Sequence, residues 1–127
     1  MNQIVLDTGA LIALERNQRS MWAALKEAVR SGADVVVPSA VLAQAWRGTP
    51  GQAHLQMALK HCVVASFDAV ARDVGVLCGK TRTQDICDAQ VAIVASRQVD
   101  VVYTSDPADL RTLFSALNAK KPRIVRC

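Results

Sequence analysis

The chain has 127 residues, of which 51% are hydrophobic and only 4% are aromatic, and its formal net charge is +4. This length fits one domain, residues 1–127, with a core built mainly from Val, Ala and Leu, and it leaves no room for a second domain. A mildly basic domain favours an anionic partner, most commonly nucleic acid, although a charge of this size is also ordinary.

The cysteines and the N-terminal segment bear on the cellular compartment. Cys62, Cys78, Cys87 and Cys127 form neither a C-x-x-C pair nor a zinc-finger spacing with histidine, so we expect reduced thiols in a cytoplasmic protein. The segment MNQIVLDTG lacks a basic region followed by a long apolar stretch, so no signal peptide is expected. Apolar runs stay far below about 18 residues, and we expect no membrane partner.

Short β-branched segments alternate with longer helical patterns along the chain. In chain order we expect a strand at 4–6, a short helix through Leu14, a helix at 20–31 ended by Gly32, a strand at 34–37, a helix from Pro38 to about Arg47, a helix at 52–60, a strand at 62–65, a helix from Asp68 to about Cys78 ended by Gly79, a helix at 86–97, a strand at 99–103, a helix at 107–118 and a strand at 123–125. This alternation predicts a three-layer α/β/α sandwich with a mostly parallel sheet of about five strands.

Acidic residues follow two of the predicted strands. In open parallel sheets, ligands bind beyond the carboxyl ends of the strands. Asp7 comes directly after the first strand, and Asp106 and Asp109 follow the fourth. Asp85 and Asp88 open the helix that precedes the fourth strand, so the start of that helix can reach the same edge. The pattern predicts a cluster of carboxylates there.

Helix capping is the competing explanation for several of these acids. Asp7, Asp85 and Asp106 each stand where an N-cap residue is expected, and taken singly each is better explained by capping than by catalysis. Asp88 differs, because at helical spacing it shares a face with the apolar residues at 91, 92 and 95. A shielded carboxylate needs a partner or a cation, which favours a functional role for Asp88.

A group of carboxylates at one edge repels itself, and a bound cation relieves that repulsion. Hard oxygen ligands select Mg²⁺ or Mn²⁺, in one or two ions. Such a centre suits phosphodiester hydrolysis by activated water.

Four segments, in order, resemble the PIN domain: LDTGALIAL, VLAQAWRG, DAQVAIVAS and VYTSDPADL. More narrowly, the chain looks like the toxin half of a VapBC-type toxin–antitoxin pair. The resemblance implies a cytoplasmic, Mg²⁺-dependent endoribonuclease with an RNA substrate, often homodimeric, held inactive by an antitoxin protein. It places the catalytic and metal-binding acids at Asp7, Asp88 and Asp106, with Asp109 as a frequent companion.

The second motif departs from the family pattern, because it has Gln44 where a glutamate is usual. An amide oxygen still accepts a hydrogen bond but adds no negative charge. We hypothesise that Asp85 partly replaces the missing charge. Arg47, one turn after Gln44, could meet a phosphate, and Ser39 could cap its helix or help to order the metal site, with capping favoured.

Two other functions compete with a nuclease. The first is a PIN-like RNA- or protein-binding module without catalysis, which Gln44 favours and the three retained acids oppose. The second is a magnesium phosphatase or receiver domain, which the surroundings of Asp7 oppose, since the D-x-D pattern is absent. We interpret the two histidines as surface or packing residues and the two tryptophans, 22 and 46, as core residues.

Overall fold

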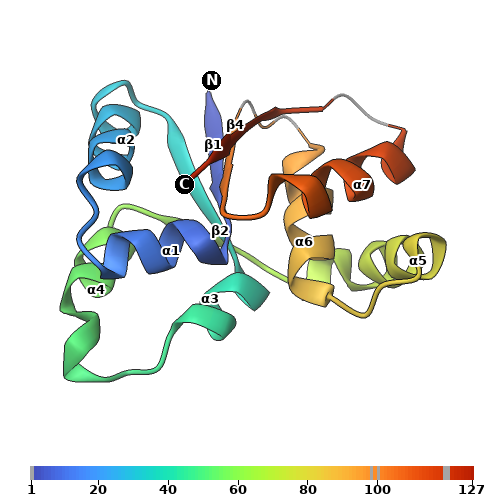
Figure 1. The fold of residues 1–127 in the computed structure, drawn as a ribbon, viewed down its shortest axis with the longest axis horizontal. Helices are drawn as coiled ribbons and strands as arrows, with labels where there is room; N and C mark the ends of the chain where they lie inside the picture. Colours follow the sequence, from blue (N-terminus) through green and yellow to red (C-terminus); the bar gives the residue numbers. More distant parts are fainter. Residues whose placement is uncertain (1, 98, 100, 119–120) are drawn as a thin grey trace.

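The computed structural model describes residues 2–97, 99, 101–118 and 121–127. Its strands form one sheet in the middle of the molecule, with helices on both sides (Figure 1). The elements, in chain order, are β1 (Gln3–Leu6), α1 (Thr8–Glu15), α2 (Arg19–Arg30), β2 (Asp34–Pro38), α3 (Ser39–Ala45), a 3₁₀ turn η1 (Pro50–Gln52), α4 (Ala53–Leu59), β3 (Val63–Ala65), a second 3₁₀ turn η2 (Asp68–Val70), α5 (Ala71–Thr81), α6 (Ile86–Ala95), β4 (Val101–Thr104), α7 (Pro107–Leu117) and β5 (Arg123–Arg126).

The sheet has five parallel strands in the order β3-β2-β1-β4-β5. Strand β1 is central, and its Ile4 pairs with Val35 of β2 on one side and with Val101 of β4 on the other. Val5 and Leu6 are fully buried, as expected of a strand covered on both faces. Because all strands run in one direction, their carboxyl ends meet at the same edge.

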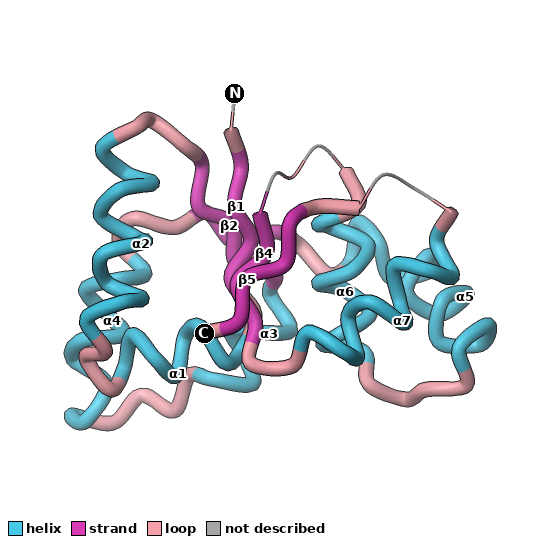
Figure 2. Tube along the Cα trace, turned by 45° about the horizontal axis from the view of Figure 1, so that its top comes forward, coloured by secondary structure: helices cyan, strands magenta, loops and turns pink. Residues whose placement is uncertain are grey.

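Two helical layers cover the sheet. Helices α1, α2 and α4 lie on one side and α5, α6 and α7 on the other, which the tube view shows as two groups flanking the strands (Figure 2). Within each group the helices contact one another, α1 with α4 and α5 with α6 and α7. Leu11, Leu14 and Leu25 fill the first interface and Leu77, Leu110 and Phe114 the second. The predicted three-layer α/β/α sandwich is confirmed.

Several predicted boundaries are wrong by a few residues. Pro38 ends β2 and caps α3 rather than beginning that helix, which stops at Ala45 before Arg47. Gly79 does not end α5, which continues to Thr81 and terminates at Arg82 in the left-handed conformation (φ 56°). The expected strand at 99–103 is β4 from Val101 onward, and position 100 of that prediction lies outside the described residues.

Two buried glutamines hold chain segments together that lie far apart in the sequence. Gln90 on α6 is fully buried; its side chain accepts from the amide of Ala40 (3.0 Å) and donates to the carbonyl of Ala65 (3.1 Å). It therefore joins the start of α3 to the end of β3. Gln52 accepts from the amides of Arg47 (2.7 Å) and Gly48 (3.0 Å), so it fixes the chain after α3.

No helix among the described residues is long and apolar enough to cross a membrane. The four cysteines, all of which are described, are free thiols. The expectation of reduced cysteines is therefore confirmed by the structure.

Candidate active site

Asp7 is the most buried acid among the described residues. It directly follows β1, is only 5% exposed, and caps α1 by accepting from the amide of Thr8 (2.7 Å). Its other carboxylate oxygen accepts from the hydroxyl of Thr104, the buried last residue of β4 (2.7 Å). The ends of two adjacent parallel strands thus hold this carboxylate in place.

The same threonine positions Asp106. The Thr104 hydroxyl oxygen accepts from the amide of Asp106 (3.0 Å), so one side chain contacts both acids. Asp106 is exposed and caps α7 through a long contact with the amide of Asp109 (3.4 Å). The predicted capping roles of Asp7 and Asp106 are therefore both observed, and both acids lie at the carboxyl edge of the sheet.

Asp85 and Asp88 come from the start of α6. Asp85 is exposed and accepts from the amide of Asp88 (3.0 Å), which is the expected N-cap interaction. Asp88 is half-buried, and the residues at 91, 92 and 95 on its helix face are buried, as the spacing predicted. The shielding inferred for Asp88 is therefore present.

Three of the acids line one open pocket of about 250 Å³. Its walls come from the end of α5 and the starts of α6 and α7: Thr81, Thr83, Asp85, Asp88, Asp109, Thr112 and Leu113. Asp106 lines an adjoining pocket of about 360 Å³ on the other side of the first turn of α7. Asp7 lines neither pocket; it is buried directly after β1.

The charges of these acids act on one another. Burial is the largest cause that raises the pKa of Asp88, and the charges of Asp7, Asp85 and Asp109 raise it further, to about 7. Burial also raises the pKa of Asp7, and the charges of Asp85 and Asp106 add to this effect against the opposing hydrogen bond from Thr104. The hydrogen bond and charge of Asp106 raise the pKa of Asp109. All five acids therefore share one electrostatic neighbourhood.

Among the described residues, no ion pair joins a basic side chain to any of these five acids. The ion pairs found within the described ranges join Arg30 to Glu27 and Arg97 to Asp73, both away from the acids. Carboxylate oxygens are the ligands that a hard divalent cation prefers, so the chemistry of these side chains suits such an ion.

The side chains are nevertheless not prearranged around an ion. In the part of the chain that the structure describes, no three His, Cys, Asp or Glu side chains are placed to hold a metal together. The physical reason is that Asp85 and Asp106 turn toward the amides of their own helices, while Asp7 faces Thr104. The long cap contact of Asp106 is the weakest of these, so its carboxylate is the easiest to reorient.

Gln44 reaches the site indirectly. Its side-chain oxygen accepts from the hydroxyl of Thr8 (2.5 Å), the residue that follows Asp7, and the side chain is exposed. The second motif therefore lies beside the start of α1. Its amide adds no charge to the acids.

Of the two other secondary residues, the phosphate contact of Arg47 stays a prediction, whereas the capping role favoured for Ser39 is wrong. Arg47 donates to the carbonyls of Ala43 (3.1 Å) and Trp46 (2.8 Å), so it closes the end of its own helix. Ser39 does not cap α3; its hydroxyl accepts from the amide of Phe67 (2.8 Å), between β3 and η2. Sequence reasoning missed both contacts, since Phe67 lies 28 residues away and helix-end geometry is not visible in spacing.

One glycine allows two segments of the site to pack closely together. A β-carbon at Gly9 would lie 2.5 Å from the β-carbon and 2.9 Å from the amide nitrogen of Ser105, closer than real side chains approach. Gly9 is in the first turn of α1, and Ser105 joins β4 to α7. The absence of a side chain therefore lets the helix after Asp7 pack against the loop that carries Asp106.

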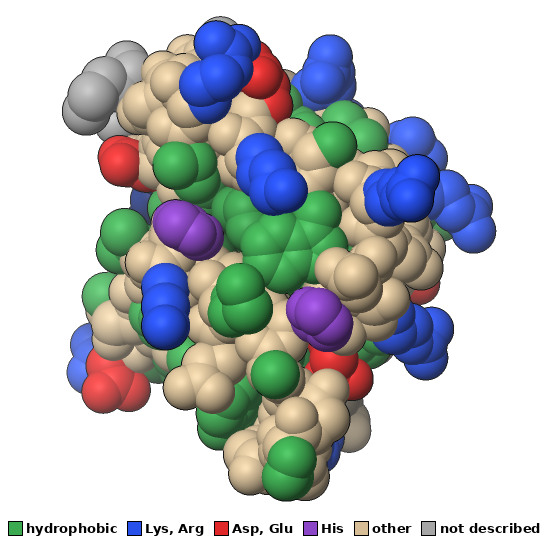
Figure 3. Space-filling model, turned by 90° about the vertical axis from the view of Figure 1, so that its left-hand side faces the viewer, with side chains coloured by type: hydrophobic (Ala, Val, Ile, Leu, Met, Phe, Trp, Pro, Cys, Tyr) green, Lys and Arg blue, Asp and Glu red, His purple; other side chains and the backbone are tan. Residues whose placement is uncertain are grey.

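A separate hollow of about 540 Å³ lies between α2 and α4, lined by Asn17, Arg19, Trp22, Ala23, Lys26, His54 and Met57. Figure 3 shows this side of the molecule, with an apolar patch flanked by both histidines and by basic side chains. Trp22 is partly buried and donates to the carbonyl of Leu14 (3.1 Å), in agreement with a packing role. Trp46 is 36% exposed, so the prediction that it belongs to the core is wrong. Both histidines lie at the surface, as expected.

No protein-family model and no curated protein matches this sequence. Among solved structures, a chain of VapBC2 from Rickettsia felis, crystallised with a DNA fragment from the promoter, superposes with a TM-score of 0.68 at 12% identity. The superposition covers 98% of this chain and 98% of that one. Identity this low bears on fold alone, and the fold agrees with the resemblance drawn from the motifs. The chain therefore has a VapC-like PIN fold.

Proposed function

We propose that this protein is a metal-dependent endoribonuclease, the toxin component of a cytoplasmic toxin–antitoxin pair. The observation that carries the proposal is the group of five acids without a basic partner in the described structure, in which the pKa of Asp88 rises to about 7. A protein that keeps such an uncompensated cluster in a surface pocket requires a cation to ionise it fully. A bound Mg²⁺ or Mn²⁺ would supply activated water and would stabilise negative charge on the scissile phosphate.

Each acid has a role in this proposal. Asp7, Asp88 and Asp106 hold the cation, and Thr104 orients two of them through its hydroxyl. Asp85 and Asp109 line the same pocket as Asp88, and their negative charges add to the attraction for the cation. RNA is the substrate in the proposal, and the net charge of +4 favours binding of a polyanion.

The partner in this proposal is an antitoxin protein that covers the acidic edge, and the toxin acts as a homodimer. Support comes from the fold, which is shared with a chain of the VapBC2 structure. An arginine presented by the antitoxin would neutralise the carboxylates in place of the cation. Co-expression with the antitoxin should raise the yield and relieve toxicity of the isolated chain.

The direct test is RNA cleavage by purified, antitoxin-free protein with Mg²⁺ or Mn²⁺ and with EDTA. We expect cleavage only with the cation. Asp7→Asn, Asp88→Asn and Asp106→Asn should each reduce cleavage by more than about a hundredfold while the protein stays folded. At the N-caps Asp7 and Asp106, Asn caps a helix about as well as Asp.

The matched control is Asp73→Asn, which removes an exposed carboxylate on α5 that pairs with Arg97 instead of with the cluster. It should cleave like wild type. Cleavage that survives EDTA would refute the metal mechanism, whereas intact RNA under every condition would favour a PIN-like binding module without catalysis.

A further inference from the structure

A pocket of opposite character adjoins the acidic one. It has a volume of about 360 Å³ and is lined by Ser105, Asp106, Pro107, Ala108, Arg111, Ile124 and Arg126. Two guanidinium groups and one carboxylate line it, whereas the pocket that holds Asp88 is lined by three carboxylates and no basic side chain. The first turn of α7 separates the two, with Asp106 on one side and Asp109 on the other.

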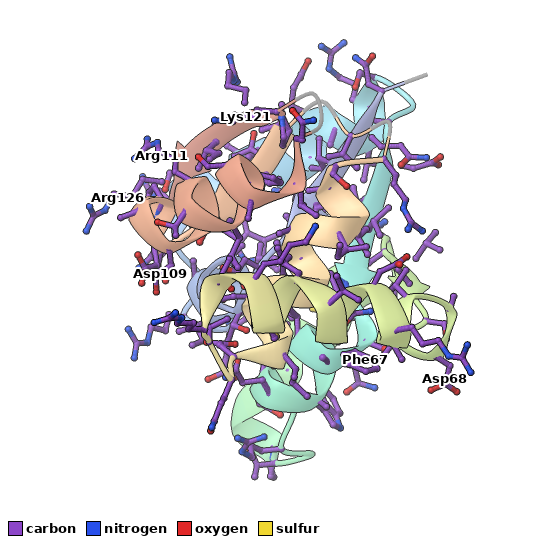
Figure 4. All side chains as sticks on the ribbon, turned by 90° about the vertical axis from the view of Figure 1, so that its right-hand side faces the viewer. Phe67, Asp68, Asp109, Arg111, Lys121 and Arg126 are labelled. Carbon is purple, nitrogen blue, oxygen red and sulfur yellow. The ribbon has the colours of Figure 1, made fainter. Side chains whose placement is uncertain are left out.

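The two arginines come from different elements and meet at this pocket. Arg111 lies one turn into α7, and Arg126 is the last residue of β5. Figure 4 shows both on the same side of the molecule, with Asp109 close below them. The backbone fixes Arg126 relative to the catalytic edge, because it pairs in register with Thr104, whose hydroxyl binds Asp7.

Neither arginine side chain makes a hydrogen bond or ion pair within the described part of the chain, and both residues are exposed. This contrasts with Arg30 and Arg97, whose guanidinium groups bind carboxylates, and with Arg47, which binds carbonyls. Two guanidinium groups at one pocket form a recognition site for an oxyanion with several acceptor oxygens, and a phosphodiester is such a group.

We propose that Arg111 and Arg126 bind a backbone phosphate of the RNA substrate beside the scissile one. The inference rests on the proposed nuclease function. The phosphate oxygens accept hydrogen bonds from both guanidinium groups, which seats the strand across the first turn of α7. The next phosphodiester then faces the carboxylates and their cation. The arginines also offset the repulsion between the polyanion and the five acids, so they act in substrate binding and not in bond cleavage.

The test compares Arg111→Gln, Arg126→Gln and the double variant with Arg72→Gln, which removes an exposed arginine on α5. Steady-state cleavage of a single-stranded RNA with Mg²⁺ should show KM raised about tenfold by each pocket variant, with kcat within about twofold of wild type. Arg111→Lys should lie between, since it keeps the charge and loses the planar fork. Arg72→Gln should match wild type.

Binding is measured separately in Asp88→Asn protein with EDTA, across salt concentrations, so that it does not depend on catalysis. Each lost arginine should flatten the plot of log affinity against log salt by about 0.7, the value for one phosphate of a single strand. Cleavage with unchanged KM and an unchanged salt slope in the double variant would overturn the inference and leave the nuclease standing. If wild-type protein does not cleave RNA but its RNA binding still requires both arginines, the proposed nuclease function is refuted and the phosphate-binding site stands. If the pocket variants lose antitoxin binding but keep the wild-type KM and salt slope, the pocket recognises protein and the inference is overturned.

Discussion

At the scale of single residues, Gln44 is the point at which this chain departs from the PIN pattern. Its side-chain oxygen accepts the Thr8 hydroxyl at 2.5 Å, next to Asp7, and it brings no charge. A glutamate would keep this hydrogen bond, because the accepting oxygen is the same in shape and position. The difference between the two residues is therefore electrostatic.

We predict that Gln44→Glu tightens Mg²⁺ or Mn²⁺ binding about tenfold and lowers the Mg²⁺ concentration needed for cleavage in the same proportion. An added negative charge near a dication is worth roughly 1–2 kcal/mol after desolvation and carboxylate repulsion oppose it. Calorimetric titration of wild type, Gln44→Glu and Asp85→Asn measures the effect. Unchanged affinity in Gln44→Glu together with lost binding in Asp85→Asn would assign the missing charge to Asp85.

The residues of the site differ in how far the sequence reveals them. Asp7 and Asp106 could be predicted because both follow parallel strands, and Asp88 because it interrupts an apolar helix face. The partners of Thr104, Ser39 and Gln90 could not, because they lie 25 to 97 residues away and arise only from tertiary packing.

At the scale of elements, the start of α1 determines how closely the two segments that carry Asp7 and Asp106 pack together. Asp7 caps this helix, and at Gly9, two residues later, an added β-carbon would overlap Ser105 in the loop before α7. A methyl group at position 9 meets the Ser105 backbone nitrogen at 2.9 Å, which side-chain rotation cannot relieve. The start of α1 and the Ser105 loop must therefore move away from each other.

Gly9→Ala should lower the melting temperature and reduce cleavage far more than stability alone explains. Overpacking of this kind costs about 1–3 kcal/mol, or roughly 5–15 °C in a domain of this size, and the movement separates Asp7 from Asp106. Thermal melting and single-turnover cleavage at a temperature where the variant is folded check the two effects.

Gly79→Ala is the matched control, because a β-carbon at this glycine in α5 has nothing within 4 Å. It should be neutral or stabilising by up to about 1 kcal/mol, since alanine favours a helix. If Gly9→Ala and Gly79→Ala have the same melting temperature and cleavage rate, the proposed close packing of Gly9 against Ser105 is contradicted.

The same helix shows why element ends resist prediction. Gly79 reads as a stop signal, yet α5 continues past it to Thr81. Leu77 is 1% exposed, and the Thr81 hydroxyl donates to its carbonyl (2.9 Å), so packing and a local hydrogen bond extend the helix. Glycine lowers helix stability without ending a helix that its neighbours hold in place.

At the scale of the whole molecule, the acidic edge makes stability depend on pH. Folding raises the pKa of Asp88 from its ordinary 3.8 to about 7, so between these values the folded chain holds a proton that the unfolded chain releases. The free energy of unfolding therefore falls as pH rises from about 4 to 7 and levels off above 7. The raised pKa of Asp7 acts in the same direction.

We predict that Asp88→Asn flattens this profile and raises the metal-free melting temperature at pH 8 by roughly 3–5 °C, with little change at pH 4. Mg²⁺ should stabilise wild type at pH 8 more than at pH 5, because protons compete with the cation for the same carboxylates. Melting curves across pH, with and without Mg²⁺, measure both. A wild-type profile that rises between pH 4 and 7 would contradict the assignment.

The layer arrangement could be predicted from the alternation of strands and helices, but the strand order could not. Alternation favours parallel neighbours and crossovers. It does not say that β1 lies in the centre, with β2 on one side and β4 on the other. The order of the strands arises from tertiary packing, which the alternation of elements does not encode.

The central place of β1 has a consequence for the folding of the growing chain during synthesis. Strand β1 is synthesised well before its neighbour β4, which begins at Val101, and the Thr104–Asp7 hydrogen bond spans 97 residues. A nascent or truncated chain that lacks the last quarter of the sequence therefore contains Asp7 but neither the threonine that holds it nor Asp106. Under the proposed function, such a chain would have no assembled site, so cleavage would require synthesis of the segment that carries Thr104 and Asp106.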